Sequence, residues 1–274
     1  MSNKRQRRGF PSAGEDVTVH RSAIDTEQTR SPSYKLAFAD DEFLLEDGLR
    51  GVRLMLEYLK PERRMRSAGI HSTVVVFGST RVRSPGSDCP ENAPRCTLDA
   101  AYYAEAQRLG ALIAEATTNG ESLDFVVMTG GGPGIMEAAN RGAADRGAPT
   151  IGLNIVLPRE QAPNPYITPD LAFQFHYFAM RKLHFLLRAR ALVFFPGGYG
   201  TLDELFEALT LLQTGRIEPL PVLLFGETFW RRIVDFEAMV EIGVISPADL
   251  ELIRFVDSAE QALEIIKAGV KAGA

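Results

Sequence analysis

Cysteine is scarce in this chain, and its scarcity excludes the structures that depend on it. Only two of the 274 residues are cysteines, Cys89 and Cys96. Two thiols cannot build a disulfide framework or a four-thiolate zinc site, and no histidine lies near them in the sequence. The two could bridge each other, but we interpret them as free thiols in a polar loop and expect a cytoplasmic protein.

Long hydrophobic runs and an excess of positive charge are also missing. No apolar stretch approaches the roughly 18–20 residues that span a bilayer, and the basic N-terminus is not followed by the apolar core of a secretory signal. The net charge of −5 argues against general nucleic-acid binding. We therefore expect no membrane and no nucleic-acid partner.

Composition divides the chain into three parts. Residues 1–35 are basic at their start and poor in apolar side chains, which predicts a mostly disordered tail. Residues 36–70 form an N-terminal extension with an amphipathic helix over 40–60, and Pro61 is expected to end that helix. Residues 71–274 contain no repeat and no second boundary, so we interpret them as one domain.

Short apolar runs alternate with helical patterns through this third part. Strands are expected at 73–77, 125–128, 150–156, 172–175, 191–195, 221–225 and 252–256. Helices are expected at 98–116, 135–146, 178–190, 202–209, 228–241 and 258–267. This alternation predicts an α/β fold with a doubly wound, mostly parallel, Rossmann-like sheet. The polar loop 84–97 has the composition of an insertion at the mouth of the sheet.

Three of the expected strands end in glycine-bearing turns. These turns are Gly78-Ser79, Gly130-Gly131-Gly132 and Gly197-Gly198-Tyr199-Gly200-Thr201. Ligands of open parallel sheets bind beyond the carboxyl ends of the strands, and glycine lets a ligand approach the backbone closely. A helix that begins at such a turn offers free N–H groups to an anion. The three turns together predict a ligand that carries a phosphate.

The common nucleotide motifs do not occur. The chain has no G-x-x-x-x-G-K-[ST] and no G-x-S-x-G, and the stretch from Gly132 to Glu137 fails the last position of the dinucleotide fingerprint. Pairs of His or Cys at the spacing of metal ligands are missing too. These absences favour a mononucleotide ligand, and nothing in the pattern calls for a metal or a cofactor.

Two charged motifs near the last glycine turn allow both a structural and a functional interpretation. Thr201-Leu202-Asp203-Glu204 fits a capping box, but Glu204 is also placed to hold ribose hydroxyls or a water. Arg181 and Lys182 are suited to bind phosphate, or they belong to a solvated basic face of a helix. The pattern alone leaves both alternatives open.

These motifs resemble those of the LONELY GUY (LOG) family. PGGYGTLDE at 196–204 matches the family's PGGxGTxxE motif, and Met180-Arg181-Lys182 matches the arginine-bearing helix that precedes it. The resemblance covers about residues 70–245 and is closer to the longer bacterial members than to the compact plant type. It implies a phosphoribohydrolase that splits a nucleoside 5′-monophosphate into free base and ribose 5-phosphate, with Arg181 and Glu204 as the catalytic pair.

The resemblance carries further expectations about substrate and assembly. It implies AMP or an N6-modified AMP such as a cytokinin riboside monophosphate, and we favour AMP with relaxed base tolerance. It implies no metal or cofactor, and a homodimer or larger dimer-based assembly for which residues 40–60 and 206–217 are apolar candidates. The expected phosphate and substrate ligands are Gly78, Ser79, Gly130, Gly131, Gly132, Lys182, Gly197, Gly198, Gly200 and Thr201.

Two other functions are compatible with parts of this pattern. A nucleotide-binding module of the same fold without turnover remains the alternative. A lysine decarboxylase, which is an old label for many members of the family, would need a pyridoxal-phosphate pocket. Lys182 is the only lysine near the expected site, and its sequence surroundings do not form such a pocket.

Overall fold

A computed structural model describes residues 10–84, 94–118, 124–158 and 162–272. The predictions for Cys89, for residues 1–9 and for most of the loop 84–97 lie outside these residues. Contacts within the chain divide it into two units, residues 1–56 and 57–274, and each is described by itself.

The first unit consists of short helical segments. It contains α1 (Ala13–Arg21), α2 (Asp41–Leu45) and the start of α3 (Arg50–Ser67). The helix α1 lies where the sequence predicts a mostly disordered tail. Ser12 and Glu15 form a capping box at its start, and none of its residues is buried, so local capping explains this helix better than core packing does.

The helix α3 continues through Pro61 to Ser67, and the prediction that Pro61 ends it is wrong. Proline has no N–H, so it leaves the carbonyl of Glu57, four residues earlier, without its helical donor. The Nε2 of the buried His184 lies 3.2 Å from that carbonyl oxygen and donates to it. A side chain from a distant helix therefore replaces the missing hydrogen bond. Pro61 itself is buried, which holds the proline within the helix.

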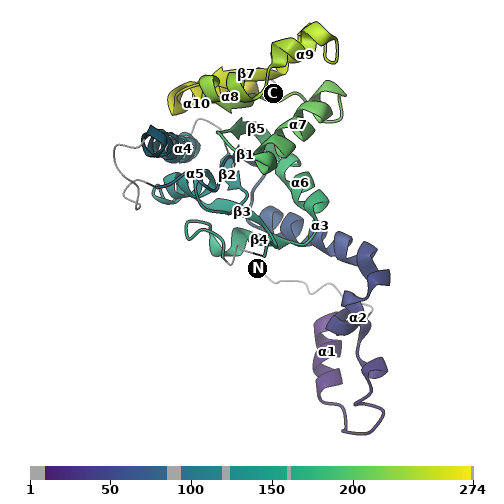
Figure 1. The fold of residues 1–274 in the computed structure, drawn as a ribbon. Coiled ribbons are helices and arrows are strands. Elements are labelled where there is room, and N and C mark those ends of the chain that lie inside the picture. Colours follow the sequence, from purple (N-terminus) through teal and green to yellow (C-terminus); the bar gives the residue numbers. More distant parts are fainter. Residues whose placement is uncertain (1–9, 85–93, 119–123, 159–161, 273–274) are drawn as a thin grey trace. The chain divides into compact units, whose positions relative to one another are not determined.

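The second unit is built on a seven-stranded sheet in which every described pair of neighbours is parallel (Figure 1). Its strands are β1 (Ser72–Phe77), β2 (Phe125–Thr129), β3 (Thr150–Ile155), β4 (Ala172–Phe175), β5 (Ala189–Phe194), β6 (Val222–Phe225) and β7 (Ile253–Val256). They lie in the order β4-β3-β2-β1-β5-β6-β7. The chain builds outward from β1 to β4 and then returns to the other side of β1 as β5, so the strand order switches between β1 and β5.

Helices cover both faces of the sheet. They are α4 (Pro94–Thr118), α5 (Ile135–Ala144), α6 (Phe178–Leu186), α7 (Tyr199–Gln213), α8 (Glu227–Ile233), α9 (Phe236–Ile242) and α10 (Ala259–Ala272). Val74 and Val76 of β1 pack in a core with α4, α5 and α10. Val75 and Phe77, which alternate with them, pack in a second core with side chains of α6, α7 and α8. Burial on both faces explains the continuous apolar strands, and the predicted α/β fold is confirmed.

Two predicted helices differ from the structure. The helix expected over 178–190 ends at Leu186, and the chain enters β5 at Ala189. The helix expected over 228–241 is divided into α8 and α9, because Asp235 caps a new helix by accepting the Ala238 N–H at 2.8 Å. None of the described helices is both long and apolar enough to cross a membrane.

Candidate active site

The three predicted glycine turns lie at the carboxyl ends of β2, β1 and β5, which are neighbours in the sheet. Ser79 connects them through its backbone. Its N–H donates to the Pro196 carbonyl (3.0 Å), and its own carbonyl accepts from the Ile135 N–H at the start of α5 (3.2 Å). The turns therefore meet at the switch in strand order, where doubly wound sheets bind their ligands.

Ser79 also offers a side-chain donor at this point. Its hydroxyl accepts a hydrogen bond from the Arg81 N–H at 3.0 Å, and a hydroxyl that accepts one bond still has its hydrogen to donate. An added Cβ at the preceding Gly78 would lie 2.6 Å from the Ile135 side chain. Glycine is thus needed for the close contact between this turn and α5, and Ser79 suits a phosphate oxygen.

The triple-glycine turn after β2 depends on two of its glycines for different reasons. Gly131 has φ +76°, a conformation that other L-residues rarely adopt, and a Cβ there would collide with the Asn154 amide. At Gly130 an added Cβ would lie 2.5 Å from Nη2 of Arg181. The turn therefore leaves room for a guanidinium group directly against its backbone.

Arg181 occupies that space and is held by backbone carbonyls. Its Nε donates to the carbonyl of Leu153 in β3 (2.6 Å), and its Nη2 donates to the Gly130 carbonyl (3.4 Å). The guanidinium carbon lies 5.1 Å from the centre of the Phe185 ring, one turn further along α6. This fixes the predicted catalytic arginine at the edge of the sheet beside the glycine turn.

The last glycine turn leads directly into α7, which begins three residues earlier than predicted. The N-cap is Gly198, and the Thr201 N–H donates to the Gly198 carbonyl at 3.0 Å. Thr201 is therefore inside the helix, and the predicted capping box between Thr201 and Glu204 is wrong. Its side chain packs instead against Gly197, where an added Cβ would collide with it. Glu204 is left without a capping role.

Gly198 and Gly200 are not explained by packing. An added Cβ at either position would meet no atom within 4 Å, and Gly200 lies in the first turn of α7, where alanine favours the helix more than glycine does. Close approach of a ligand to the N–H groups at the start of α7 would explain both glycines.

Gly200→Ala tests this interpretation. We expect it to raise the free energy of unfolding by about 0.5 kcal/mol and to raise the KM for a nucleoside monophosphate about tenfold, because the methyl group obstructs the anion. Chemical denaturation and steady-state kinetics measure the two effects. Gly51→Ala, at an equally open position in α3, is the control and should stabilise without raising KM. An unchanged KM in Gly200→Ala would contradict the interpretation.

Glu204 lies one turn inside α7, half-buried beside the charges of α6. Burial raises its pKa from the 4.5 of an ordinary glutamate to about 7, although the positive charges of Lys182 and Arg181 act to lower it. A carboxyl group with this pKa exists in both protonation states near neutral pH. Such groups suit proton transfer and charge stabilisation in catalysis.

Lys182, predicted to contact the ligand, is paired with two carboxylates of α7. Its Nζ lies 2.7 Å from Oδ2 of Asp203 and 2.6 Å from Oε2 of Glu207. Burial disfavours the charged ammonium, but these carboxylates outweigh burial and raise the pKa of Lys182. The ion pairs join α6 to α7, so they hold the helix of Arg181 against the helix of Glu204.

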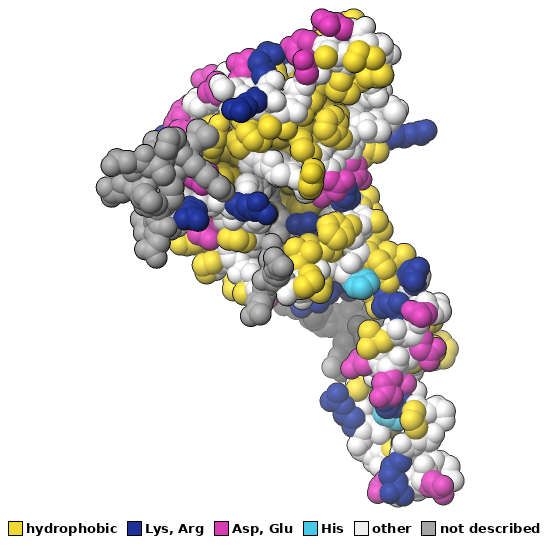
Figure 2. All heavy atoms as spheres, viewed as in Figure 1, with side chains coloured by type: hydrophobic (Ala, Val, Ile, Leu, Met, Phe, Trp, Pro, Cys, Tyr) yellow, Lys and Arg dark blue, Asp and Glu magenta, His cyan; other side chains and the backbone are white. Residues whose placement is uncertain are grey.

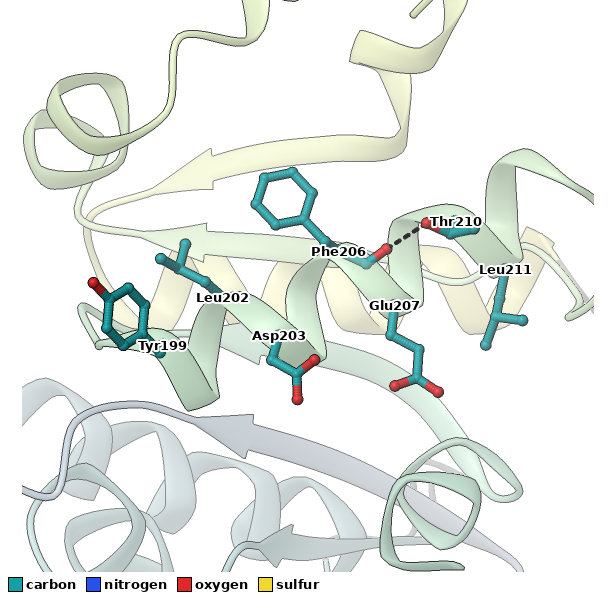
Figure 3. Close-up of a pocket in the computed structure, with 7 residues that line it drawn as sticks. All are labelled: Tyr199, Leu202, Asp203, Phe206, Glu207, Thr210 and Leu211. Atoms are coloured by element: carbon teal, nitrogen blue, oxygen red, sulfur yellow. Dashed lines mark hydrogen bonds between the residues drawn. The ribbon is translucent and has the colours of Figure 1, made fainter. Parts of the chain in front are cut away.

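A groove follows the outer face of α7. It has a volume of about 490 Å³ and is lined by Tyr199, Leu202, Asp203, Phe206, Glu207, Thr210 and Leu211. Figure 3 shows Asp203 and Glu207 next to each other on one side of the helix, with Phe206 pointing to the opposite side. The groove therefore combines an acidic edge, which is paired with Lys182, and an apolar edge.

The side chains and carbonyls that hold the two expected catalytic residues in place were not predicted from the sequence. The pairing of Lys182 with Asp203 and Glu207 could have been suspected, since the two acids are four residues apart on one predicted helix. No pattern pointed to the Leu153 carbonyl as an acceptor for Arg181. Among the residues that the structure describes, no three His, Cys, Asp or Glu side chains are grouped as a metal site would require.

Comparison with known proteins gives matches across this site. A family model described as "Possible lysine decarboxylase" matches residues 136–266, which include Arg181 and Glu204. The chain is 33% identical over 146 residues to the cytokinin riboside 5′-monophosphate phosphoribohydrolase LOG3 of Arabidopsis thaliana, and 32% identical over 146 residues to LOG1 of the same plant. Each match covers 52% of this chain and 65% of the relative.

A solved structure also resembles the chain. The molybdenum cofactor binding protein from the phototrophic bacterium Rippkaea orientalis aligns over 72% of this chain and 95% of its own, at 22% identity and a TM-score of 0.47. The family model, whose match spans the helix of Arg181 and the turn that leads to Glu204, is more specific to this site. On these matches, the chain is similar to members of the LOG family.

Proposed function

We propose that the protein hydrolyses the N-glycosidic bond of a purine nucleoside 5′-monophosphate and releases the free base and ribose 5-phosphate. The observation that supports this most directly is the position of Glu204. A carboxyl group with a pKa of about 7 lies one turn from the anion-binding end of α7. Arg181 is near enough for its charge to act on this carboxyl group.

The arrangement suits such a reaction. The phosphate would bind the N–H groups at the start of α7 and the Ser79 hydroxyl, which places the ribose over the first turn of the helix. As the C1′–N bond breaks, its electron pair goes to the base and positive charge develops on the sugar. The Glu204 carboxylate would stabilise that charge and orient a water, whose oxygen bonds to C1′ and whose proton ends on the base.

The substrate is proposed from the same chemistry and from the names of the relatives. The Arabidopsis relatives are named for cytokinin riboside 5′-monophosphates, so we propose AMP and N6-modified AMP, with AMP favoured. A panel of AMP, N6-modified AMP, GMP and CMP, assayed for base release by chromatography, tests this. Binding of AMP without release of adenine would favour the alternative, a nucleotide-binding module without turnover.

We further propose that two copies of the chain associate through the outer face of α7. The Tyr199 side chain is 92% exposed and that of Phe206 is 37% exposed, and Figure 2 shows hydrophobic and acidic side chains together on the face viewed. Large exposed apolar side chains that share one face are typical of a protein interface.

Phe206→Asp is expected to convert this dimer to a monomer, because it places a charge at the centre of the proposed interface. Light scattering coupled to size-exclusion chromatography measures the mass. Ile242→Asp changes an exposed apolar residue of α9 and should leave the dimer intact. A monomeric wild-type protein, or a Phe206→Asp variant that stays dimeric, would contradict this interface.

A further inference from the structure

A network of hydrogen-bonded, buried polar side chains lies beneath the triple-glycine turn. Thr129 Oγ1 donates to Oδ1 of Asn140 (2.7 Å), and the Asn164 amide Nδ2 donates to the same oxygen (3.0 Å). Asn140 donates in turn to the Ile151 carbonyl on β3 (3.4 Å). Thr129 and Asn140 are fully buried and Asn164 is 7% exposed, so these bonds are shielded from competing water.

Asn164, one member of this network, also forms hydrogen bonds to the backbone of the triple-glycine turn. Its backbone N–H donates to the Gly131 carbonyl (2.9 Å), and its side-chain Nδ2 donates to the Gly132 carbonyl (3.1 Å). Thr129 Oγ1 accepts the Gly131 N–H from the strand side (3.0 Å). Because C=O and N–H point in opposite directions across a trans peptide, the bond to the Gly131 carbonyl directs the Gly132 N–H away from Asn164.

The same turn supports the guanidinium of Arg181. The Gly130 carbonyl accepts from Arg181 Nη2, and Gly131 follows directly in the chain. A rotation of the Gly130–Gly131 backbone would therefore move both a wall of the expected phosphate site and an acceptor of the catalytic arginine. Successive glycines rotate more freely than any other residues, so this turn needs external bonds to keep one conformation.

We propose that Asn164 is a positioning residue for nucleotide binding. It fixes the conformation of the triple-glycine turn and thereby the position of the Gly130 carbonyl, which accepts a hydrogen bond from Arg181. This inference rests on the function proposed above. Loss of the Asn164 amide leaves the turn to sample other conformations. Because apparent affinity falls in proportion to the competent fraction, a turn that is competent about one tenth of the time binds about tenfold more weakly.

The test compares variants that remove these hydrogen bonds with variants that keep them. In the Glu204→Gln background, which binds AMP without consuming it, Asn164→Ala and Thr129→Val are each expected to raise the dissociation constant for AMP about tenfold. Isothermal titration calorimetry measures this at a temperature where each variant is folded. Thr129→Ser keeps the hydroxyl and should recover affinity relative to Thr129→Val. The KM for AMP should rise with the dissociation constant, and kcat should fall less than KM rises.

Thr150→Val is the matched control. Thr150 is buried and its hydroxyl donates to the Tyr166 carbonyl (2.7 Å), so it anchors the same loop without touching the glycine turn. It should lower the melting temperature but leave AMP binding as in the wild type. Equal loss of AMP affinity in Thr150→Val and Asn164→Ala would show a merely structural role and overturn the inference, as would unchanged affinity in Asn164→Ala.

The design also separates this inference from the proposed function. Adenine release by the wild type tests hydrolysis, whereas calorimetry with AMP tests positioning. If the wild type binds AMP without releasing adenine but Asn164→Ala still weakens binding, the function fails and the inference stands. A wild-type protein that binds no nucleoside monophosphate would overturn both.

Discussion

Glu204→Gln is expected to lower the kcat for base release from AMP by about 10²–10⁴-fold, the range typical of a lost acid–base group. The amide has the shape of the carboxyl group but cannot carry the negative charge that stabilises an oxocarbenium-like sugar. The fold and AMP binding should persist, because Glu204 caps no helix: α7 begins at Gly198. Steady-state kinetics with calorimetry of AMP binding measures both effects.

The pH dependence of the wild type follows from the same group. The raised pKa of about 7 means that the charged carboxylate becomes dominant only above neutral pH. We expect kcat/KM to rise with pH through about 7 and then to level off, because the carboxylate is the reactive form. Glu204→Gln should lose this rise together with most of the rate. A profile that is flat from pH 5 to pH 8 in the wild type would contradict this role.

The same pKa predicts a change in stability. The folded-state pKa of about 7 exceeds the 4.5 of an ordinary glutamate, so the folded protein binds more protons than the unfolded chain between these values. The stabilisation that protonated Glu204 provides is complete below pH 4.5 and is lost as pH rises through about 7. At pH 8, Glu204→Gln should therefore be more stable than the wild type, by on the order of 1–3 kcal/mol.

Glu207→Gln is the matched control for these measurements. Glu207 lies on the same helix and pairs with Lys182, so its replacement removes a carboxylate from α7 without removing the proposed catalyst. Its loss of rate should be far smaller than that of Glu204→Gln. Equal losses in the two variants would indicate that the negative charge of the helix, not Glu204 itself, carries the effect.

Arg181→Lys is expected to lower kcat/KM about 10²–10³-fold, as for loss of one charge-stabilising donor. A planar guanidinium reaches the Leu153 and Gly130 carbonyls from two of its nitrogens, whereas a lysine ammonium has a single nitrogen and cannot reproduce that geometry. Steady-state kinetics with AMP measures the loss. Arg190→Lys, at the opposite end of β5, is the matched control and should retain activity.

Arg181→Ala adds a second readout that a purely structural role would not produce. The charge of Arg181 lowers the pKa of Glu204, so its removal should move the rise in kcat/KM to higher pH. The double variant with Glu204→Gln should lose less than the product of the two single losses, because residues that act together are not additive. An unshifted pH profile in Arg181→Ala would contradict the coupling of the two residues.

The fold was predictable because its strands are buried on both faces. β1 has four successive apolar residues from Val74 to Phe77, which pack alternately into the two cores, and such runs are visible without a structure. The meeting of the three turns was predictable as well, since the carboxyl ends of parallel strands share one edge. The roles assigned to the residues of those turns remain predictions.

The details that were wrong or missed depend either on contacts between distant parts of the chain or on a choice between two local helix starts. Pro61 should end a helix on local grounds, but the buried His184 satisfies the carbonyl that the proline frees. Glu204 fits a capping box on local grounds, but a glycine N-cap lets α7 begin earlier. The bond from Asn164 to the Gly132 carbonyl joins residues 32 positions apart, and no periodicity or motif indicates such a pair.

The central claim is that the chain breaks an N-glycosidic bond, and quantifying both products from AMP tests it most directly. Purified wild-type protein should release adenine and ribose 5-phosphate in equal amounts, while Glu204→Gln binds AMP and releases almost none. Wild-type protein that binds AMP and releases neither product would contradict the account.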